Sequence, residues 1–235
     1  MKNAFSNLAN NQLSRKFGGN KTTVADPYVT GYHFIYWEKL PGGIGINTAN
    51  MSSGVSQSDI GTILQAACLS VTPPGGTLSQ IEFAGLGGIK WSVPGNVDYG
   101  TTISIKYLEM NRTPILDIHH GWVKMIRDYR TGVSQIPEND DGSDYSKNSY
   151  SGLLYYWTTD PSCSVIENFA CFDGVFPLKD PQDLFSSDIE SIGKLEIDID
   201  YSYDYMWREE WVKAKCQTFN DALSASESNI TGITY

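Results

Sequence analysis

The chain has 235 residues, 40% of them hydrophobic, and a net charge of −10. That length suffices to bury a full core, and no apolar run approaches the roughly 18 residues that cross a bilayer. The first 25 residues contain no apolar secretion signal. Four scattered cysteines and three histidines give neither a C-x-x-C pair nor a histidine-rich metal-binding pattern. We therefore expect a protein that does not span a membrane, keeps its thiols reduced and has no metal centre.

The charge is distributed unevenly along the chain. Residues 1–131 carry a net charge of +3, whereas residues 132–235 carry −13. An acidic surface repels phosphate, so tight binding of nucleic acid by counterion release is excluded. An acidic surface also keeps a protein soluble. Composition alone does not decide whether the acidic residues have a function beyond solubility.

Residues 1–25 form the first distinct segment, rich in Asn, Ser, Lys and Gly and without periodicity. Such a composition predicts an arm that becomes ordered only against a partner. Residues 26–235 are predicted to form a single β domain with loop insertions and a flexible C-terminal end. Its first strand is expected in residues 28–37, which are aromatic and β-branched, followed by a turn at Pro41-Gly42-Gly43.

The next two segments differ in how strongly they predict structure. Between Asn47 and Ser70, a short helix opening at Ser58 and a loop with a brief strand both fit. Beyond the glycine-rich turn at residues 73–76, the runs LSQIEFAG, GGIKWSV and DYGTTISIKYLEM predict a β meander, with a turn at Pro94-Gly95-Asn96.

Residues Thr113 to Arg130 are predicted to form a helix that packs against a sheet. Thr113 suits the N-cap, Pro114 the first turn and Gly132 the exit. Its apolar stripe at helical spacing consists of Ile115, Ile118, Trp122, Met125, Ile126 and Tyr129. The adjacent His119 and His120 project about 100° apart, so they are expected to be structural histidines instead of a metal-binding pair.

Polar residues 133–150 predict a surface loop, and the spacing of its acids does not match a calcium loop. Strands are expected again in GLLYYWTT and SVIENFACFDGVF. Beyond Trp207, the run WREEWVKAKCQTF favours a short amphipathic helix that reaches a neighbour.

Lys194 to Tyr205, KLEIDIDYSYDY, alternates between apolar and acidic residues. The pattern predicts one strand of roughly 40 Å with an apolar and an acidic face. Its four carboxylates are Glu196, Asp198, Asp200 and Asp204. The pattern alone fits two roles for these carboxylates: they protect a strand edge against aggregation, or they form a functional acidic surface.

No pattern typical of a catalytic site is present. The run FAGLGG has no glycine at the last fingerprint position, where Lys90 stands, and there is no G-x-S-x-G or H-E-x-x-H motif. Asp198 and Asp200 could serve glycoside hydrolysis, but two neighbouring acids on one strand face indicate catalysis poorly. We expect a protein that is not an enzyme, with no cofactor and no catalytic or metal-binding residues.

Three segments together carry a resemblance to a known family. They are DPYVTGYHFIYWEKLP, then LSQIEFAGLGGIKWSVPGNVDYGTTISIKYLE directly before the predicted helix, and finally FDGVFPLKDPQDLFSSDIESIGKLEIDIDYSYDYM. In content and order these resemble the tail tube proteins of contractile-tailed bacteriophages. The chain is longer than the compact members in residues 43–75, in residues 131–150 and beyond Trp207.

The resemblance implies a mainly β fold, a β-sandwich or barrel with one flanking helix. It also implies a virion protein, assembled in the host cytoplasm, whose hexameric rings stack into the conduit for DNA ejection. Implied partners are further copies of the chain, the sheath protein, the tape-measure protein, the baseplate and neck or terminator proteins, and double-stranded DNA in transit, without membrane insertion. A tail terminator or tube-initiator ring of the same fold, and a type VI secretion-like tube protein, are the alternatives.

The resemblance also suggests roles for three sets of residues. The acidic set Glu196, Asp198, Asp200 and Asp204 is expected to face the lumen, where negative charge keeps DNA from adhering. The outer, sheath-facing helix is represented by Trp122, Lys124, Arg127 and Arg130, and the inter-subunit arm by Phe17, Asp26, Pro27 and Tyr28.

Overall fold

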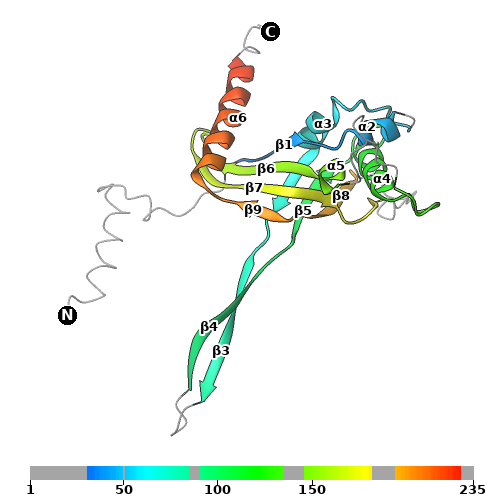
Figure 1. Cartoon of the computed structure of the whole chain (residues 1–235). Coiled ribbons are helices and arrows are strands. Elements are labelled where there is room, and N and C mark those ends of the chain that lie inside the picture. The colour runs from blue at the N-terminus through cyan, green and yellow to red at the C-terminus, as the bar shows by residue number, and fades with distance from the viewer. Residues whose placement is uncertain (1–30, 50, 85–89, 135–145, 182–193, 229–235) are drawn as a thin grey trace.

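A computed structural model describes residues 31–49, 51–84, 90–134, 146–181 and 194–228. The protein is mainly β, as predicted, with a seven-stranded sheet and a separate two-stranded ribbon (Figure 1). The elements are β1 His33–Lys39, α2 Gly43–Thr48, α3 Ile60–Ala67, β2 Cys68–Thr72, β3 Gly76–Ala84, β4 Lys90–Tyr99, β5 Thr102–Leu108, α4 Pro114–Ile126, α5 Lys147–Tyr150, β6 Gly152–Thr159, β7 Ile166–Pro177, β8 Glu196–Ser202, β9 Tyr205–Trp207 and α6 Glu210–Ser228.

The inner face of the seven-stranded sheet curves around a large hydrophobic core. Its strand order is β1-β6-β7-β8-β5-β2, and β9 also pairs with β7. The two end strands, β1 and β2, contact each other, which gives the sheet a barrel-like curvature. Alternate residues of β5 and β8 point inward, and the inner face of α4 covers them. Among the largest buried side chains of this core are Tyr107, Trp122, Phe172 and Tyr201.

Between residues 41 and 72 the structure adds a helix after one predicted turn and decides between two alternatives that the sequence left open. The predicted turn at Pro41-Gly42-Gly43 leads directly into helix α2, which packs on α4. The segment that allowed either a helix or a loop forms helix α3 and then strand β2. Ile60 and Leu64 of α3 are fully buried, so tertiary packing stabilises this short helix.

Helix α4 begins at Pro114 as predicted but ends at Ile126, four residues before the predicted end. Arg127 has extended backbone angles, and the chain then forms a turn around Asp128. The Asp128 carboxylate accepts a hydrogen bond from the Arg130 N–H at 2.7 Å. Gly132, at φ +70°, donates its N–H to the Asp128 carbonyl at 2.7 Å. Gly132 therefore closes this turn, and the predicted helix was too long because Asp128 stabilises another local structure.

The N-terminus of α4 is capped by a residue that the sequence pattern did not indicate. Thr113 occupies the N-cap position in a left-handed conformation, and its side chain makes no capping bond. Instead, the Glu109 carboxylate accepts hydrogen bonds from the N–H groups of Ile115 at 3.1 Å and Leu116 at 2.9 Å. A carboxylate at this end also interacts favourably with the helix dipole.

Replacing Glu109 by alanine is expected to lower the free energy of unfolding by about 1–2 kcal/mol, because two N–H groups at the helix start lose their acceptor. Urea denaturation followed by circular dichroism measures the change. Glu167→Ala, at an exposed position of β7, is the control and should shift the midpoint by less than a third as much. Equal shifts for the two variants would contradict this capping role.

Helix α6 is longer than the short amphipathic helix predicted after Trp207 and packs on its own sheet, while the predicted contact with a neighbouring subunit stays a prediction. Val212 and Cys216 are fully buried against the outer face of β6 and β7, in a second hydrophobic cluster with Tyr155 and Trp157. Lys215 forms an ion pair with Glu38 of β1 at 2.7 Å. The short amphipathic pattern therefore belonged to a longer helix with an internal partner. No helix in the part of the chain that the structure describes is long and apolar enough to cross a membrane.

The acidic-apolar segment is not one straight strand. Inward positions are buried from Ile197 to Tyr203, as the alternation predicted, but β8 ends at Ser202 and β9 begins at Tyr205. The Tyr203 N–H donates to the Thr101 carbonyl at 3.2 Å, and the Asp204 N–H to the Asp173 carbonyl at 2.9 Å. The chain therefore leaves β5 at Tyr203 and continues along β7, with which both β8 and β9 pair, and the predicted strand of roughly 40 Å was wrong.

Candidate assembly surface

Strands β3 and β4 form a hairpin that projects away from the body of the protein (Figure 1). All of its described residues are exposed except Gly95, which is half-buried. Pro94-Gly95-Asn96 lies within β4 and not at a turn as predicted, and the ladder passes this segment with a register shift between Leu78 and Gln80. Since β4 pairs only with β3, a proline without an N–H is tolerated on its open edge.

One face of the outer half of the hairpin is apolar. The pairs Ile81–Val93 and Phe83–Trp91 lie directly opposite each other in the ladder, so their side chains share a face. The rings of Phe83 and Trp91 stack with centroids 6.5 Å apart. All four side chains are exposed, Trp91 at 53%.

The other face of the same half carries polar side chains. Glu82 lies opposite Ser92, and Gln80 lies opposite Pro94. The hairpin is therefore an amphipathic ribbon with no core beneath its apolar face. An isolated two-stranded ribbon is marginally stable in water, and a contiguous exposed apolar patch marks an interaction surface.

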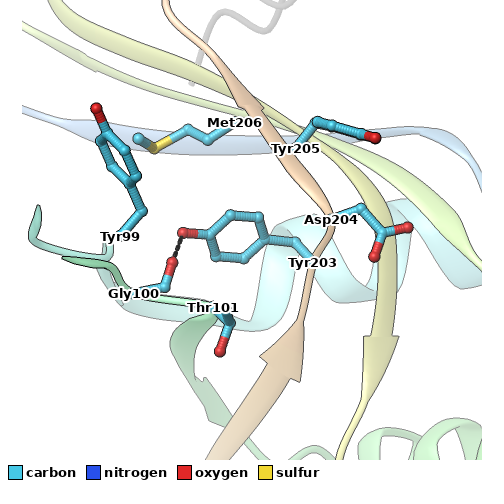
Figure 2. A pocket seen from close by; sticks show the side chains of 7 residues that line it. All are labelled: Tyr99, Gly100, Thr101, Tyr203, Asp204, Tyr205 and Met206. Carbon is cyan, nitrogen blue, oxygen red and sulfur yellow. Dashed lines mark hydrogen bonds between the residues drawn. The ribbon is translucent and has the colours of Figure 1, made fainter. Parts of the chain in front are cut away.

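The hairpin continues the β2–β5 pair through two connectors. Pro73 and Pro74 lack N–H groups, so the ladder cannot run without interruption along this side. On the other side, Gly100 and Thr101 join β4 to β5. Figure 2 shows the Tyr203 hydroxyl directed at the Gly100 carbonyl, to which it donates a hydrogen bond.

A cavity of about 380 Å³ lies beside this second connector, between the root of the hairpin and the segment that links β8 to β9. Tyr99, the last residue of β4, stands on one side of it, and Met206 of β9 projects from the other (Figure 2). Tyr99 is 66% exposed. The hairpin therefore leaves the body beside open space and not against a packed wall.

Three of the four predicted lumen-facing acids share one exposed face. Glu196, Asp198 and Asp200 point outward from β8. Two lysines reduce their charge: Lys106 lies 3.6 Å from Glu196 and 3.7 Å from Asp198, and Lys194 lies 3.2 Å from Glu196. The hydrogen bond from Lys194 lowers the pKa of Glu196. This face is less acidic than the strand sequence suggested, because the lysines come from β5 and from the residues before β8.

Asp204 lies apart from the other three acids, because the strand is interrupted between Ser202 and Tyr205. Its carboxylate forms an ion pair with Lys147 at 2.5 Å. It also packs against Gly174, where a Cβ would lie 2.5 Å from the carboxylate and where φ is +73°. Asp204 therefore holds the link between β8 and β9 against α5 and β7.

The residues of the predicted outer helix separate into two groups. Trp122 is fully buried, packs against Trp37 with ring centroids 5.6 Å apart, and donates its indole N–H to the Tyr150 carbonyl at 2.8 Å. Lys124 is half-buried, whereas Arg127 and Arg130 are exposed beyond the end of α4. Trp122 therefore belongs to the core, and the two arginines are the exposed members of the set that was predicted to face the sheath.

The predicted inter-subunit arm is not placed by the structure. Its four candidate residues, Phe17, Asp26, Pro27 and Tyr28, lie outside the described residues.

The core contains a chain of hydrogen bonds centred on His119. The Ile115 carbonyl, 2.7 Å from Nδ1, can only accept, so Nδ1 carries the proton. Nε2 must then accept from the Tyr201 hydroxyl, which in turn accepts from the Tyr107 hydroxyl at 3.0 Å. Burial lowers the pKa of His119 to about 4. His119 is a satisfied structural histidine, as predicted, and so is His120, whose Nδ1 lies 2.6 Å from the Asp180 carboxylate.

Sequence reasoning missed the hairpin and the role of Tyr203. The prolines and glycines at residues 73–76 and Gly100 were a signal for an interrupted ribbon, but the first group was assigned to an ordinary turn and Gly100 to the inside of a strand. Tyr203 fitted the strand alternation, so nothing in its neighbourhood marked it as a contact to residues 100 and 101. Among the described residues, no group of three or more His, Cys, Asp or Glu side chains is arranged to hold a metal ion.

No protein-family model and no curated protein matches this sequence. Among solved structures, a chain of the anti-feeding prophage baseplate is 11% identical, with a TM-score of 0.46 over 77% of this chain and 95% of that chain. A chain from the sheath/tube terminator of the PVC extracellular contractile injection system, in its extended state, is 14% identical, with a TM-score of 0.43 over 77% of this chain and 96% of that chain. A chain of the tube-terminating cap of the anti-feeding prophage is 12% identical, with a TM-score of 0.42 over 80% and 97%.

Proposed function

We propose that this chain is a structural, non-enzymatic subunit of a contractile phage tail or a related particle. Six copies form a ring, and the rings stack into the inner tube through which DNA leaves the virion. The order of the three sequence segments that resemble tail tube proteins supports this proposal. The structural observation that carries it is the amphipathic β3–β4 hairpin.

The hairpin needs a partner on energetic grounds. Full burial of each large apolar side chain stabilises by about 1.5–3 kcal/mol, and four of them are exposed on one face, Ile81, Phe83, Trp91 and Val93. Both edges of the two-stranded ribbon also present backbone groups that a further strand can pair with. A second copy of the chain covers this face in the proposed assembly.

A contact between the hairpin of one copy and the body of the next joins two different surfaces. Such a heterologous contact repeats in one direction and gives closed rings or open helical filaments. Both results suit a tube, whereas an isologous dimer would bury the hairpin against its own copy. Electron microscopy can therefore distinguish the proposed rings or filaments from an isologous dimer.

Two further exposed surfaces are assigned to the lumen and to the sheath contact in this assembly. The exposed face of β8, with Glu196, Asp198 and Asp200, is the candidate lumen surface, where carboxylates discourage DNA from adhering. Arg127 and Arg130 are candidates for contact with the sheath protein. The tape-measure protein, the baseplate and the neck or terminator proteins are the remaining proposed partners. Assembly takes place in the host cytoplasm, without insertion into a membrane.

The test is negative-stain electron microscopy and sedimentation velocity of the untagged protein over a concentration series. Phe83→Lys combined with Trp91→Glu should raise the concentration needed for rings or tubes about a hundredfold, because two apolar contacts of about 1.5 kcal/mol each are lost. Its unfolding midpoint should stay close to that of the parent, since both side chains are already exposed in the single subunit.

The matched control places charges on the opposite face of the same ribbon. Glu82→Lys with Ser92→Glu should assemble like the parent, because these paired residues lie on the polar face. Six-fold rings that never stack would identify the chain as a terminator or tube-initiator ring. A parent protein that stays monomeric at every concentration, or a control that fails as completely as the test variant, would contradict the proposal.

A further inference from the structure

The angle of the β3–β4 hairpin is set at its root, because its strands have no core of their own. Apart from the half-buried Gly95, the described residues of the two strands are exposed. The β2–β5 ladder of the body ends at the pair Thr72–Ser104, and the β3–β4 ladder of the hairpin begins at the pair Gly76–Tyr99. Between these pairs lie the connectors described above, and the hairpin can tilt there without breaking either ladder.

Tyr203 makes two hydrogen bonds to the Gly100–Thr101 connector. Its backbone N–H donates to the Thr101 carbonyl at 3.2 Å, and its hydroxyl donates to the Gly100 carbonyl. The tyrosine ring is itself held firmly, since the residue is 7% exposed and its ring packs edge-on against Phe172, with centroids 5.1 Å apart. One side chain therefore joins the core of the sheet to the root of the hairpin.

We propose that Tyr203 is a positioning residue that latches the hairpin: its hydroxyl fixes the connector and thereby the angle at which the hairpin leaves the body. The latch belongs to the isolated subunit and does not depend on the proposed function. Its consequence for assembly rests on that function, because neighbouring copies meet through the hairpin. A hairpin at a defined angle places every following copy at the same rotation, which a closed ring requires.

The surroundings of the connector allow movement when the latch is released. The cavity of about 380 Å³ lies beside Gly100, and Tyr99 faces Met206 across it (Figure 2). Tilting the hairpin toward the body brings Tyr99 onto Met206 and fills part of this space. Gly100 provides the required backbone freedom, because it has no side chain to collide with Pro74.

Tyr203→Phe tests the latch with the smallest change, since it removes the hydroxyl and keeps the ring against Phe172. Nitroxide labels on Ser92→Cys of the hairpin and Glu167→Cys of β7 report the angle through their distance distribution, measured by pulsed EPR on the monomer. The background carries Cys68→Ser and Cys163→Ser, while Cys171 and Cys216 are buried and stay unlabelled. The expected result is a distribution at least twice as wide as that of the parent.

Tyr107→Phe is the matched control, because it also removes one buried tyrosine hydroxyl, but one that contacts Tyr201 and not the connector. It should leave the distance distribution unchanged even where it lowers the unfolding temperature more than Tyr203→Phe does. Unchanged widths for Tyr203→Phe, or equal broadening in both variants, would overturn the latch.

A second measurement separates the latch from the proposed function. In electron micrographs, Tyr203→Phe should give fewer closed rings and more irregular oligomers than the parent at the same concentration. If the parent forms no rings but the EPR distribution broadens, the latch stands and the proposed function fails. Rings of unaltered yield and diameter together with a broadened distribution would show that the latch does not determine ring geometry.

Discussion

Replacing Trp122 by alanine is expected to lower the free energy of unfolding by about 4–6 kcal/mol. The side chain is fully buried between β1 and β8, where its ring contacts those of Trp37 at 5.6 Å and Tyr201 at 6.2 Å. Removing a buried tryptophan costs about 3–5 kcal/mol, because the surrounding structure only partly fills the cavity. The Tyr150 carbonyl also loses the indole N–H that it accepts at 2.8 Å, which adds about 1 kcal/mol to the loss.

Trp211→Ala provides the control for this prediction. Trp211 is 47% exposed at the start of α6, and its indole N–H reaches only the exposed Glu209. Its replacement should change the free energy of unfolding by less than about 1 kcal/mol. Urea denaturation measures both variants, and comparable losses would show that Trp122 does not occupy the core position described above.

The elements predicted correctly are those whose pattern reflects local burial. The strand GLLYYWTT matches β6, Gly152–Thr159, residue for residue, because six of its eight residues are buried and the run is bounded by turns. The inward face of β8 also follows the alternation, since the sheet has one core side and one solvent side. Helix α4 begins where Pro114 predicts, because proline is suited to the first helical turn.

The features that the sequence did not predict depend on contacts between distant residues. The strand alternation continues through Tyr203 and Asp204, but the strand is interrupted there, with backbone hydrogen bonds to Thr101 and Asp173, and the pairing with β5 ends. The capping carboxylate of Glu109 precedes the helix by five residues and cannot be inferred from a capping box. The hairpin was read as part of a meander because apolar strand patterns do not reveal whether a core lies beneath them.

Acidification from neutral pH to about pH 4 is expected to destabilise the protein by about 3 kcal/mol through His119 alone. Burial lowers the pKa of this imidazole from 6.5 to about 4, because the core solvates the charged form poorly, and the hydrogen bond to the Ile115 carbonyl offsets this only in part. Between these pH values the unfolded chain binds a proton that the folded chain does not. The stabilisation is therefore complete above pH 6.5 and is lost as the pH falls toward 4.

Protonation also reverses the hydrogen-bond chain of the core. A protonated Nε2 becomes a donor to the Tyr201 hydroxyl, which must then rotate to donate to Tyr107, so the Tyr107 hydroxyl proton loses its acceptor. Acid should therefore weaken the contact between α4 and β8 before other parts of the core. Hydrogen exchange of the amides in α4, measured at pH 7 and pH 4.5, should show this as a selective loss of protection.

His119→Gln separates this effect from the general acid sensitivity of an acidic protein. A glutamine amide can donate to the Ile115 carbonyl and accept from Tyr201 without titrating, so the variant should start less stable at pH 7 and lose less between pH 7 and pH 4. Because the slope against pH reports the difference in bound protons, an unchanged slope in His119→Gln would mean that the buried imidazole does not govern acid stability.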